Sequence, residues 1–389
     1  MSKHILLGIS GGIAAYKSCE LVRLLKKQGH SVSVVMSKAS TEFISPLTFQ
    51  ALSGNPVLTD THENGLGNGM AHINLTREAD ALVITPATAN TIAKISHGIA
   101  DNLLTNLVAA RKCPLAVAPA MNVEMWNNPA NLRNIEQLRS DGITVFQPAY
   151  GEQACGEIGL GRMLEAADLA DLISDLWIPK ILLGKRILIT AGATFEAIDP
   201  VRGITNISSG QMGTALARAC RAAGAKVTLI YGQLQTTIPT GLLHTEQAVS
   251  AEEMFRDQDV FISVAAVADY KVKNSSSQKM KKDGSGKVPV IELTENPDIL
   301  ASIASLPTPP FCVGFAAESE HILEYARVKR IRKNIPMLIA NQISLSMGKT
   351  TNQITIIDDE NEISFPETDK RQAADNIVKH LATRLNRSS

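Results

Sequence analysis

A thiol in an unusual setting, Cys155, is the first residue of this sequence whose type and position suggest chemistry. It lies in YGEQACGEIGLGRM, where the glycines at 151, 156, 159 and 161 predict a flexible flap. A cysteine on such a flap could close over a ligand and deliver a proton. Free cysteines are more often buried packing residues, so the residues alone leave both interpretations open.

A second unusual segment is PAMNVEMW, residues 119–126, which follows the apolar run CPLAVA. An apolar run closed by Pro119 predicts the carboxyl end of a buried strand, where a chain usually turns and becomes polar. Here one amide, Asn122, instead stands among Met121, Met125 and Trp126. This pattern is unexpected for a turn that faces solvent.

The histidine of GMAHINLTREAD, His72, follows the glycine-rich run NGLGNGM. Histidine can hold or exchange a proton near neutral pH. A single histidine before Ile73 is more often a structural or merely exposed side chain, so the residues alone do not favour a functional role for it.

Two segments of small residues in the first half are suited to a phosphate group. GISGGIAAYK places Ser10, Gly11 and Gly12 between a predicted strand and a predicted helix, where backbone amides can approach an anion. TPATANTIAKI places hydroxyl and amide side chains at the end of another strand. Ligands of open parallel sheets lie at the carboxyl ends of strands, so both segments can face one pocket. A tight turn at the glycines and a helix cap at Thr88 or Asn90 explain the same residues without a ligand.

Alternating strands and helices surround these segments. Short runs rich in Val and Ile, separated by helices, indicate parallel sheets covered on both faces. We therefore predict an α/β protein of two domains, residues 1–180 and 181–389, with a boundary near residue 180. Predicted strands cover residues 4–10, 31–37, 79–88, 114–120, 186–192, 225–232, 259–270 and 311–318, and predicted helices cover residues 14–29, 166–177 and 209–224.

Composition restricts the class of protein. A chain of 389 residues is too long to fold around one ordinary hydrophobic core, which also favours two domains. Lys plus Arg and Asp plus Glu are both 38, so no net charge favours nucleic acid or an anionic membrane. No run approaches the roughly 20 apolar residues that cross a bilayer, and no cleavable signal precedes the first strand. Five scattered cysteines without a CxxC pair argue against a disulfide framework and against a cysteine zinc site. We therefore expect the protein to lie in a reducing cytoplasm.

The second half carries a long loop between a strand and its helix, ITAGATFEAIDPVRGITNISSGQMG. Such loops commonly span about 2 to 6 residues, so a longer one suggests a function. Arg202 can bind a phosphate or a carboxylate through two hydrogen bonds, and Asn206 can donate from its amide. Residues 208–210 open the helix and could hold phosphate. A capped helix after an Asp-Pro turn is the simpler alternative.

Further charged residues follow in this half. Asp269 ends the predicted strand SVAAVADY, where an acid that faces a metal or a nucleotide is expected. Lys279 begins the run KMKK in NSSSQKMKKDGSGK, a predicted mobile loop whose charges could close over a triphosphate or be only solvated. Lys329 and Lys333 are one helical turn apart, on a face that could meet solvent or a second phosphate.

Four motifs of the first half occur in order in one family. SGGIAAYK, TPATANTIAKISHGIADNLL, PAMNVEMW and ACGEIGLGRM together resemble the flavin-containing cysteine decarboxylases, in particular phosphopantothenoylcysteine decarboxylase, over nearly all of residues 3–165. The resemblance implies a flavodoxin-like, three-layer fold, an FMN cofactor and trimers with sites between subunits. It implies an active-site role for His72, substrate carboxylate binding by Asn122, and proton donation by Cys155 on a substrate clamp. The residues implied to contact FMN are Ser10, Gly11, Gly12, Ser37, Thr85, Ala87, Thr88 and Asn90.

The chemistry of such a decarboxylase fits these residue types. Loss of CO₂ from an ordinary cysteine amide leaves an unstabilised carbanion, whereas a flavin can first oxidise the thiol to a thioaldehyde that accepts the electrons. The resulting enethiolate must be reduced and then protonated at carbon by an acid such as Cys155. His72 could take the thiol proton or hold charge in that region. An amide in an apolar pocket can orient the carboxylate while Met121, Met125 and Trp126 keep water away.

The second half resembles phosphopantothenate–cysteine ligase from about residue 184 to 360, with a Rossmann-like fold expected. Decarboxylase followed by ligase is the order in the bacterial bifunctional coenzyme A biosynthesis proteins. The resemblance implies that Asn206 stabilises an acyl-cytidylate and that Arg202 assists in making or using it. Lys279 belongs to the KxKK motif of that family. The residues implied to contact CTP are Ser263, Val264, Ala265, Asp269, Lys279, Pro297, Asp298, Ile299, Leu300, Phe315, Lys329 and Lys333, and Asp269 is also a candidate Mg²⁺ ligand.

One position departs from the pattern of the ligase family. Ala193, in AGATFE, stands where the usual motif has proline. Proline contributes no hydrogen-bond donor, so we expect a less rigid loop without loss of chemistry.

These assignments together predict two consecutive reactions. A carboxylate oxygen is too poor a leaving group for amide formation, so attack on the α-phosphate of CTP would give an acyl-CMP and pyrophosphate. The amine of cysteine would then displace CMP, while lysines and Mg²⁺ spread the charge of the triphosphate. The nucleotide base follows from the resemblance alone. The product of the second half is the substrate of the first, which would convert it to 4′-phosphopantetheine.

Other functions fit the sequence less well. A flavin- or NAD-linked oxidoreductase would need GxGxxG after RILITAG, which is absent. A flavin prenyltransferase or a peptide cysteine decarboxylase would not need the second half. A regulatory subunit built on a decarboxylase-like trimer is disfavoured by the intact His72, Asn122 and Cys155. We expect small-molecule substrates, no nucleic-acid or membrane partner, and a homo-oligomer of decarboxylase trimers and ligase dimers, up to a dodecamer.

Overall fold

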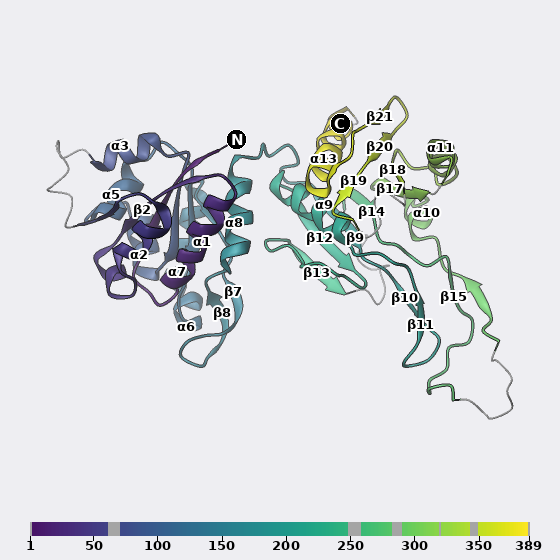
Figure 1. Cartoon of the computed structure of the whole chain (residues 1–389), viewed down its shortest axis with the longest axis horizontal. Helices are drawn as coiled ribbons and strands as arrows, with labels where there is room; N and C mark the ends of the chain where they lie inside the picture. Colours follow the sequence, from purple (N-terminus) through teal and green to yellow (C-terminus); the bar gives the residue numbers. More distant parts are fainter. Residues whose placement is uncertain are drawn as a thin grey trace. The chain divides into compact units, whose positions relative to one another are not determined.

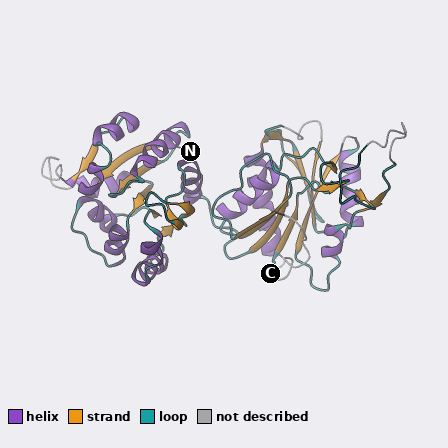
Figure 2. Ribbon diagram, turned by 90° about the horizontal axis from the view of Figure 1, so that it is seen from below, coloured by secondary structure: helices purple, strands orange, loops and turns teal. Residues whose placement is uncertain are grey.

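Two compact units make up the chain. The computed structural model describes residues 2–60, 71–247, 258–281, 290–318, 320–342 and 349–387, and of residues 71 and 72 it describes only the backbone. The units are Met1–Trp177 and Ile178–Ser389, and each combines a sheet with helices, as Figure 1 and Figure 2 show. Within the described ranges, no helix is both long and apolar enough to span a membrane.

The first unit is built on a six-stranded sheet in which all neighbouring strands are parallel. The order is β3-β2-β1-β4-β5-β6. Without the short edge strand β3, this is the flavodoxin-like order 2-1-3-4-5, so the predicted α/β class and flavodoxin-like fold are confirmed. The strands are β1 (His4–Ile9), β2 (Ser31–Met36), β3 (Val57–Thr59), β4 (Ala81–Ala87), β5 (Leu115–Pro119) and β6 (Thr144–Val145).

Helices cover both faces of this sheet and give the three layers. One face packs against α1, α2 and α8, and the other packs against α4, α5 and α7. Every residue of the central strands β4 and β5 is buried, which explains their continuous apolar sequences. The helices are α1 (Ala15–Lys27), α2 (Pro46–Ser53), α3 (Ala71–Glu78), α4 (Ala89–Ser96), α5 (Leu103–Ala110), α6 (Val123–Asn127), α7 (Pro129–Ser140) and α8 (Ala166–Ser174).

The second unit contains an eight-stranded sheet of order β13-β12-β9-β14-β17-β18-β20-β21. Its first six strands are parallel and follow the Rossmann order 3-2-1-4-5-6, while β20 and β21 add an antiparallel edge. The strands are β9 (Arg186–Ala191), β12 (Lys226–Tyr231), β13 (His244–Gln247), β14 (Val260–Ser263), β17 (Phe311–Glu318), β18 (Met337–Gln342), β20 (Ile354–Ile357) and β21 (Glu362–Ser364).

Two pairs of helices cover this second sheet. α9 (Gln211–Ala222) and α13 (Lys370–Arg387) pack on one face, and α10 (Ile299–Ala304) and α11 (Ile322–Arg332) pack on the other. Two short strand pairs lie outside the main sheet, and the predicted ligase residues Arg202, Asn206 and Asp269 directly flank them. They are β10 (Phe195–Ala197) with β11 (Gly203–Thr205), and β15 (Tyr270–Val272) with β16 (Leu293–Glu295). Figure 1 shows β10, β11 and β15 extending away from that sheet.

The strand predicted at residues 259–270 is shorter than expected. β14 ends at Ser263, because the next two N–H groups, of Val264 and Ala265, donate to the hydroxyl of Thr190 at 3.2 and 3.3 Å instead of pairing with a strand. The prediction that Asp269 ends a strand of the main sheet is therefore wrong. Asp269 instead directly precedes β15.

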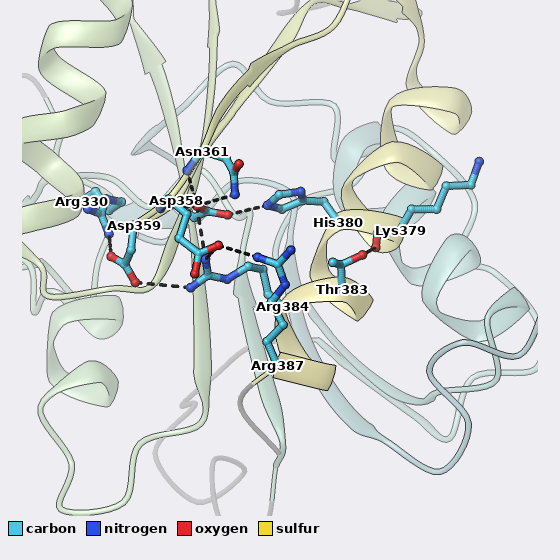
Figure 3. Close-up of polar contacts among 10 residues, drawn as sticks. Arg330, Asp358, Asp359, Asn361, Lys379, His380, Thr383, Arg384 and Arg387 are labelled. Carbon is cyan, nitrogen blue, oxygen red and sulfur yellow. Dashed lines mark hydrogen bonds and ion pairs between the residues drawn. The ribbon is translucent and has the colours of Figure 1, made fainter.

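A buried carboxylate, Asp358, holds the C-terminal helix against the edge of the second sheet (Figure 3). Its Oδ2 accepts a hydrogen bond from His380 Nε2 of α13 at 2.6 Å, and its Oδ1 lies 3.4 Å from Arg384 Nη1. Burial opposes its ionisation, but the N–H of Glu360 and the His380 ring outweigh burial and lower the pKa of Asp358. This cluster fixes α13, whose first residue is Lys370.

Two candidate active sites

A cavity of about 660 Å³ in the first unit gathers the predicted decarboxylase motifs. Its walls come from the glycine turn after β1, the end of β4, the segment after β5, and a hairpin formed by β7 (Ala149–Glu152) and β8 (Ile158–Arg162). Of the predicted site residues, those that line the cavity are Gly11, Gly12, Thr88, Asn122 and Cys155.

The glycine turn and the end of β4 are joined by Ser10. Its hydroxyl donates to the carbonyl of Pro86 at 2.7 Å and accepts from the N–H of Thr88 at 3.0 Å. Thr88 also caps α4, because its side chain accepts from the N–H of Thr91 at 3.3 Å. Ser10 thus holds two neighbouring strand ends together, and Thr88 both caps a helix and lines the cavity.

Five residues predicted to contact FMN, Ser10 among them, do not line this cavity. Thr85 and Ala87 are completely buried within β4, and the Thr85 hydroxyl donates to Met163 Sδ at 3.6 Å. Ser37 caps a short 3-10 helix, and Asn90 is exposed on α4. The predicted FMN contacts of these five residues stay predictions.

Helix capping explains the orientation of the Asn122 amide. Asn122 is the N-cap of α6, and its Oδ1 accepts from the N–H of Glu124 at 2.8 Å. The oxygen is thereby engaged, and Nδ2 faces the hairpin, where it lies 3.4 Å from Cys155 Sγ and 3.3 Å from Gln153 Oε1. Nδ2 also donates to the carboxylate of Glu157. The amide therefore presents a donor beside the thiol.

The glycine-rich segment around Cys155 forms a β-hairpin of β7 and β8. Cys155 is exposed in its turn, which the N–H of Gln153 closes by donating to the carbonyl of Glu157 at 2.8 Å. At Gly161, φ is +136° and a Cβ atom would lie 2.3 Å from the carbonyl oxygen of Met121. Gly161 therefore permits close docking of the hairpin on the chain after β5, and the predicted flexibility of the segment stays a prediction.

The apolar neighbours of Asn122 divide between the cavity and the core. Met121 and Met125 line the cavity, as predicted. Trp126 is only 4% exposed and packs in the core with the helices of one face, so its predicted role in keeping water out of the pocket is wrong. Helix α6 turns this side chain inward. His72 lies in α3, where the structure describes its backbone but not its side chain.

Several polar residues of this cavity lie outside the site residues predicted from the sequence motifs. Gln153 accepts from the N–H of Val123 at 2.9 Å and donates to the carbonyl of Leu160 at 3.2 Å, and so joins α6 to the hairpin. Lys17 and Arg162 add positive charge to the walls. Lys17 Nζ donates to the carbonyl of Met163 at 3.1 Å and pairs with a glutamate. Their only sequence signal was proximity to the glycine turn and to the ACGE motif.

In the second unit, a buried carboxylate that the sequence did not single out organises the long loop. Asp199 is 1% exposed and accepts from the N–H groups of Val201 and Arg202, both at 2.9 Å. It also accepts from Arg202 Nε at 3.0 Å and from the N–H of Met280 at 3.1 Å. Hydrogen bonding by the Arg202 guanidinium holds the pKa of Asp199 far below its usual range. Asp199 therefore ties Arg202 to the segment that carries Lys279.

Two ligase residues predicted on this loop are exposed. Arg202 Nη2 donates to the carbonyl of Met280 at 2.8 Å. Asn206 Nδ2 donates to the carbonyl of Ala266 at 3.1 Å and lines a cavity of about 650 Å³. Lys279 is exposed beside Met280, and the last lysine of KMKK, Lys282, lies outside the described residues.

A second group of predicted residues lies at the start of α10 and at the end of α11. Lys333 Nζ lies 3.0 Å from Asp298, which caps α10 by accepting from the N–H of Ala301 at 3.0 Å. Burial lowers the pKa of Lys329, and the charge of Lys333 lowers it further, while Glu318 and Asp269 act in the opposite direction. The predicted ligands Pro297, Ile299 and Leu300 belong to this same α10 start. Among the side chains described, no group of three potential metal ligands occurs, so Mg²⁺ binding at Asp269 stays a prediction.

A third cavity, of about 120 Å³, lies at the start of α9. It brings the predicted residues Ser208, Val264 and Phe315 together with Asn352 and Lys370 from distant parts of the chain. Gly213 allows the helix to approach β9, because a Cβ atom there would lie 2.5 Å from Ala191 Cβ. Ser263 and Ala265 flank Val264 at the end of β14.

The alanine that replaces the family's proline gains a hydrogen bond. The N–H of Ala193 donates to the carbonyl of Gln233 at 3.1 Å, and the N–H of Gln233 donates back at 2.8 Å. Ala193 is 1% exposed. Proline could not make the first of these bonds, so the substitution adds an anchor to a loop for which we expected lower rigidity.

Comparisons with known proteins cover both units. Residues 1–177 match the Flavoprotein family model, and residues 182–385 match the DNA/pantothenate metabolism flavoprotein C-terminal domain. The Coenzyme A biosynthesis bifunctional protein CoaBC of Vibrio cholerae serotype O1 is 45% identical over 391 residues, which cover 97% of each chain. This chain belongs to the CoaBC family. The resemblance inferred from the motifs is thereby confirmed.

Two further CoaBC proteins, from Escherichia coli and Bacillus subtilis, support the same membership. The CoaBC of Escherichia coli K12 is 43% identical over 353 residues, which cover 88% of this chain and 86% of that protein. The CoaBC of Bacillus subtilis strain 168 is 39% identical over 395 residues, with coverages of 98% and 97%. A solved C-terminal domain of a CoaBC protein covers 53% of this chain and 98% of that chain, with 36% identity and a TM-score of 0.45.

Proposed function

We propose that this chain catalyses two consecutive steps of coenzyme A biosynthesis. The second unit would join 4′-phosphopantothenate to cysteine at the expense of CTP, and the first unit would decarboxylate the product to 4′-phosphopantetheine. The observation that carries this proposal is the first cavity, which unites Gly11, Thr88, Asn122 and Cys155 in a chain of the CoaBC family.

The first cavity fits a flavin mononucleotide. Its volume of about 660 Å³ lies within the range of roughly 300–1,000 Å³ for small-molecule pockets. The glycine turn before α1 lines the cavity, and its backbone N–H groups can approach a phosphate. Ala14, Met121 and Met163 offer apolar surface to a ring. When bound, FMN supplies the two-electron oxidation and reduction on which this decarboxylation depends.

The residues of the cavity then have separate tasks. Asn122 Nδ2 is aimed by the helix cap and would take the substrate carboxylate in place of Glu157. Met121 and Met125 would exclude water from that carboxylate. Cys155 Sγ lies 3.4 Å from the amide nitrogen, so its thiol would lie near a carboxylate held by that amide. It would donate the proton that the carbon needs after loss of CO₂.

For the ligase reaction, the second unit offers cations and donors. The carboxylate of 4′-phosphopantothenate would attack the α-phosphorus of CTP, with pyrophosphate as leaving group, and the amine of cysteine would then displace CMP. Arg202 and Asn206 would stabilise the acyl-cytidylate from the long loop. Lys279, Lys329 and Lys333, together with Mg²⁺ near Asp269, would balance the triphosphate charge.

We also propose that the chain forms a homo-oligomer of decarboxylase trimers and ligase dimers. In the part of the second unit that the structure describes, Arg202, Lys279, Lys329 and Lys333 do not line the cavities of about 650 and 120 Å³. A neighbouring subunit that covers these side chains would complete the ligase site. We also propose the cytoplasm as the location of the protein, as the scattered cysteines of the sequence suggest.

One experiment tests both activities. The purified chain is examined for flavin absorbance and incubated with 4′-phosphopantothenate, cysteine, Mg²⁺ and either CTP or ATP, with pyrophosphate and the pantetheine products quantified. We expect a yellow protein that forms pyrophosphate with CTP and releases 4′-phosphopantetheine. Absence of pyrophosphate with both nucleotides contradicts the ligase assignment, and a colourless protein that still releases CO₂ contradicts the FMN assignment.

A further inference from the structure

The amide that is assigned to the substrate carboxylate also donates to a carboxylate of the chain itself. Asn122 Nδ2 donates to Glu157, which lies in the turn of the β7–β8 hairpin. Glu157 Oε2 lies 3.7 Å from Cys155 Sγ as well. One carboxylate therefore contacts both groups on which the proposed decarboxylation depends, and the reaction scheme gives it no task.

Glu157 is the strongest acceptor that the described residues present to this amide. Asn122 Oδ1 is engaged by the N–H of Glu124 at 2.8 Å, so the N–H₂ group is the part that can bind a carboxylate. The other acceptors of Nδ2 are neutral, namely Gln153 Oε1 at 3.3 Å and Cys155 Sγ at 3.4 Å. Hydrogen bonds to an ionised acceptor are roughly twice as strong as those between neutral groups.

A second carboxylate at the same amide would be repelled by the first, because like charges disfavour each other at close range. Binding of a substrate carboxylate by Asn122 therefore breaks the hydrogen bond to Glu157. This exchange does not require the hairpin to move. The carbonyl of Glu157 accepts from the N–H of Gln153 at 2.8 Å, which fixes the backbone of the turn, whereas the Glu157 side chain is exposed and can rotate into solvent.

We propose that Glu157 competes with the substrate carboxylate for Asn122, and so weakens binding of the substrate without weakening binding of the product. This inference rests on the decarboxylase function proposed above. The product carries no carboxylate and leaves the hydrogen bond from Asn122 to Glu157 intact. Binding energy that holds substrate and transition state equally well does not raise kcat, so the competition lowers the affinity for substrate without slowing the reaction of bound substrate.

Dissociation constants of the FMN-loaded, full-length chain, measured by titration calorimetry, test the proposal. One probe is phosphopantothenoylserine, which keeps the carboxylate of the substrate but has a hydroxyl group in place of the thiol. The other is 4′-phosphopantetheine, which has no carboxylate. We expect Glu157→Ala to lower the dissociation constant of the serine analogue by roughly 3- to 10-fold, the low end for a charge-assisted hydrogen bond because Glu157 is exposed. That of 4′-phosphopantetheine should stay unchanged.

Two further variants separate this competition from a general effect of charge. Glu124→Gln removes an exposed carboxylate of α6 and should change neither dissociation constant. Asn122→Ser keeps a side chain suited to the helix cap but lacks the N–H₂ group. In that background, Glu157→Ala should no longer tighten binding of the serine analogue. The same tightening there, or in Glu124→Gln, would show general charge repulsion and would overturn the proposal.

Two results with Glu157→Ala itself would also overturn the proposal. These are an unchanged dissociation constant of the serine analogue, and equal changes for both probes with a lower melting temperature, which would give Glu157 a structural role only. If Glu157→Ala does not fold or bind FMN, Glu157→Gln repeats the test. It removes the charge but keeps an acceptor oxygen, so we expect a smaller fall in the same direction, and no fall would contradict the proposal. Failure of the decarboxylase function would be seen separately, as absence of decarboxylation by the unmodified chain.

Discussion

The cavity of the first unit and the ligase residues of the second are positioned in different ways. In the first unit, Asn122 and Cys155 lie 3.4 Å apart in one cavity whose walls are strand ends and a docked hairpin. In the second unit, Arg202 and Lys279 belong to segments that extend from the main sheet, while Lys329 belongs to α11. These segments depend on specific links such as Asp199.

This difference teaches where each site is sensitive. A site made of strand ends is held by the sheet itself, so its chemistry depends mainly on the residues that touch the substrate. A site made of extended segments depends also on side chains that hold those segments together. Positioning residues should therefore matter more in the second unit than in the first.

The largest effect should follow removal of the thiol in the first cavity. We expect Cys155→Ala to lower formation of 4′-phosphopantetheine by roughly 100- to 10,000-fold, the usual contribution of general acid catalysis, with oxidised enethiol accumulating instead. Product analysis by mass spectrometry measures both species. Cys113→Ala, at a half-buried cysteine outside the cavity, is the matched control. Normal turnover by Cys155→Ala would remove the thiol from the mechanism.

A smaller effect, confined to the second unit, should follow Asn206→Asp. Replacing the amide by a carboxylate puts negative charge beside the acyl-cytidylate, and we expect ligation to fall roughly 100-fold. Decarboxylation of supplied phosphopantothenoylcysteine should stay unchanged, and both rates are measured on one preparation. Loss of both activities would indicate a folding defect and would contradict an effect confined to the second unit.

A positioning effect should follow Asp199→Asn. The neutral side chain holds Arg202 and Met280 less firmly, and we expect ligation to fall roughly 10-fold, in line with the loss of one charge-assisted hydrogen bond. If Asp199→Asn ligates at the rate of the unmodified chain, the link from Asp199 to Arg202 and Met280 does not matter for the reaction.

The same residue predicts a pH dependence of stability. The folded-state pKa of Asp199 is depressed, so its stabilising contribution is present above the unfolded pKa of about 4 and is lost as the pH falls below that value. Thermal melting between pH 6 and pH 3 should therefore depend less on pH in Asp199→Asn than in the unmodified chain. Parallel curves for the two proteins would argue against this assignment.

The smallest effect should follow Ala193→Pro, which restores the usual residue of the ligase family. Because proline removes the N–H that donates to Gln233, we expect the free energy of unfolding to fall by about 1 kcal/mol with ligation retained. Denaturant unfolding measures the change, and Ala193→Ser, which keeps the N–H, is the control. A more stable proline variant would show that this hydrogen bond is not a net anchor.

Local sequence was sufficient for most of the architecture. The apolar runs at residues 4–10, 31–37 and 311–318 form β1, β2 and β17 with boundaries shifted by at most one residue. Short apolar runs separated by helices are typical of parallel strands. Because the carboxyl ends of such strands meet at one sheet edge, the sequence also brought Gly11, Thr88 and Asn122 to a common cavity.

Other features arise only when distant segments pack together. Trp126 turns into the core, and Cys155 lies on a docked hairpin, because of the contacts that α6 and Gly161 make there. Asp199 meets Met280 and Lys370 meets Gln211 across long stretches of chain. A residue's own neighbours in sequence carry no record of such partners, since burial and charge pairing depend on which surfaces the folded sheet places in contact.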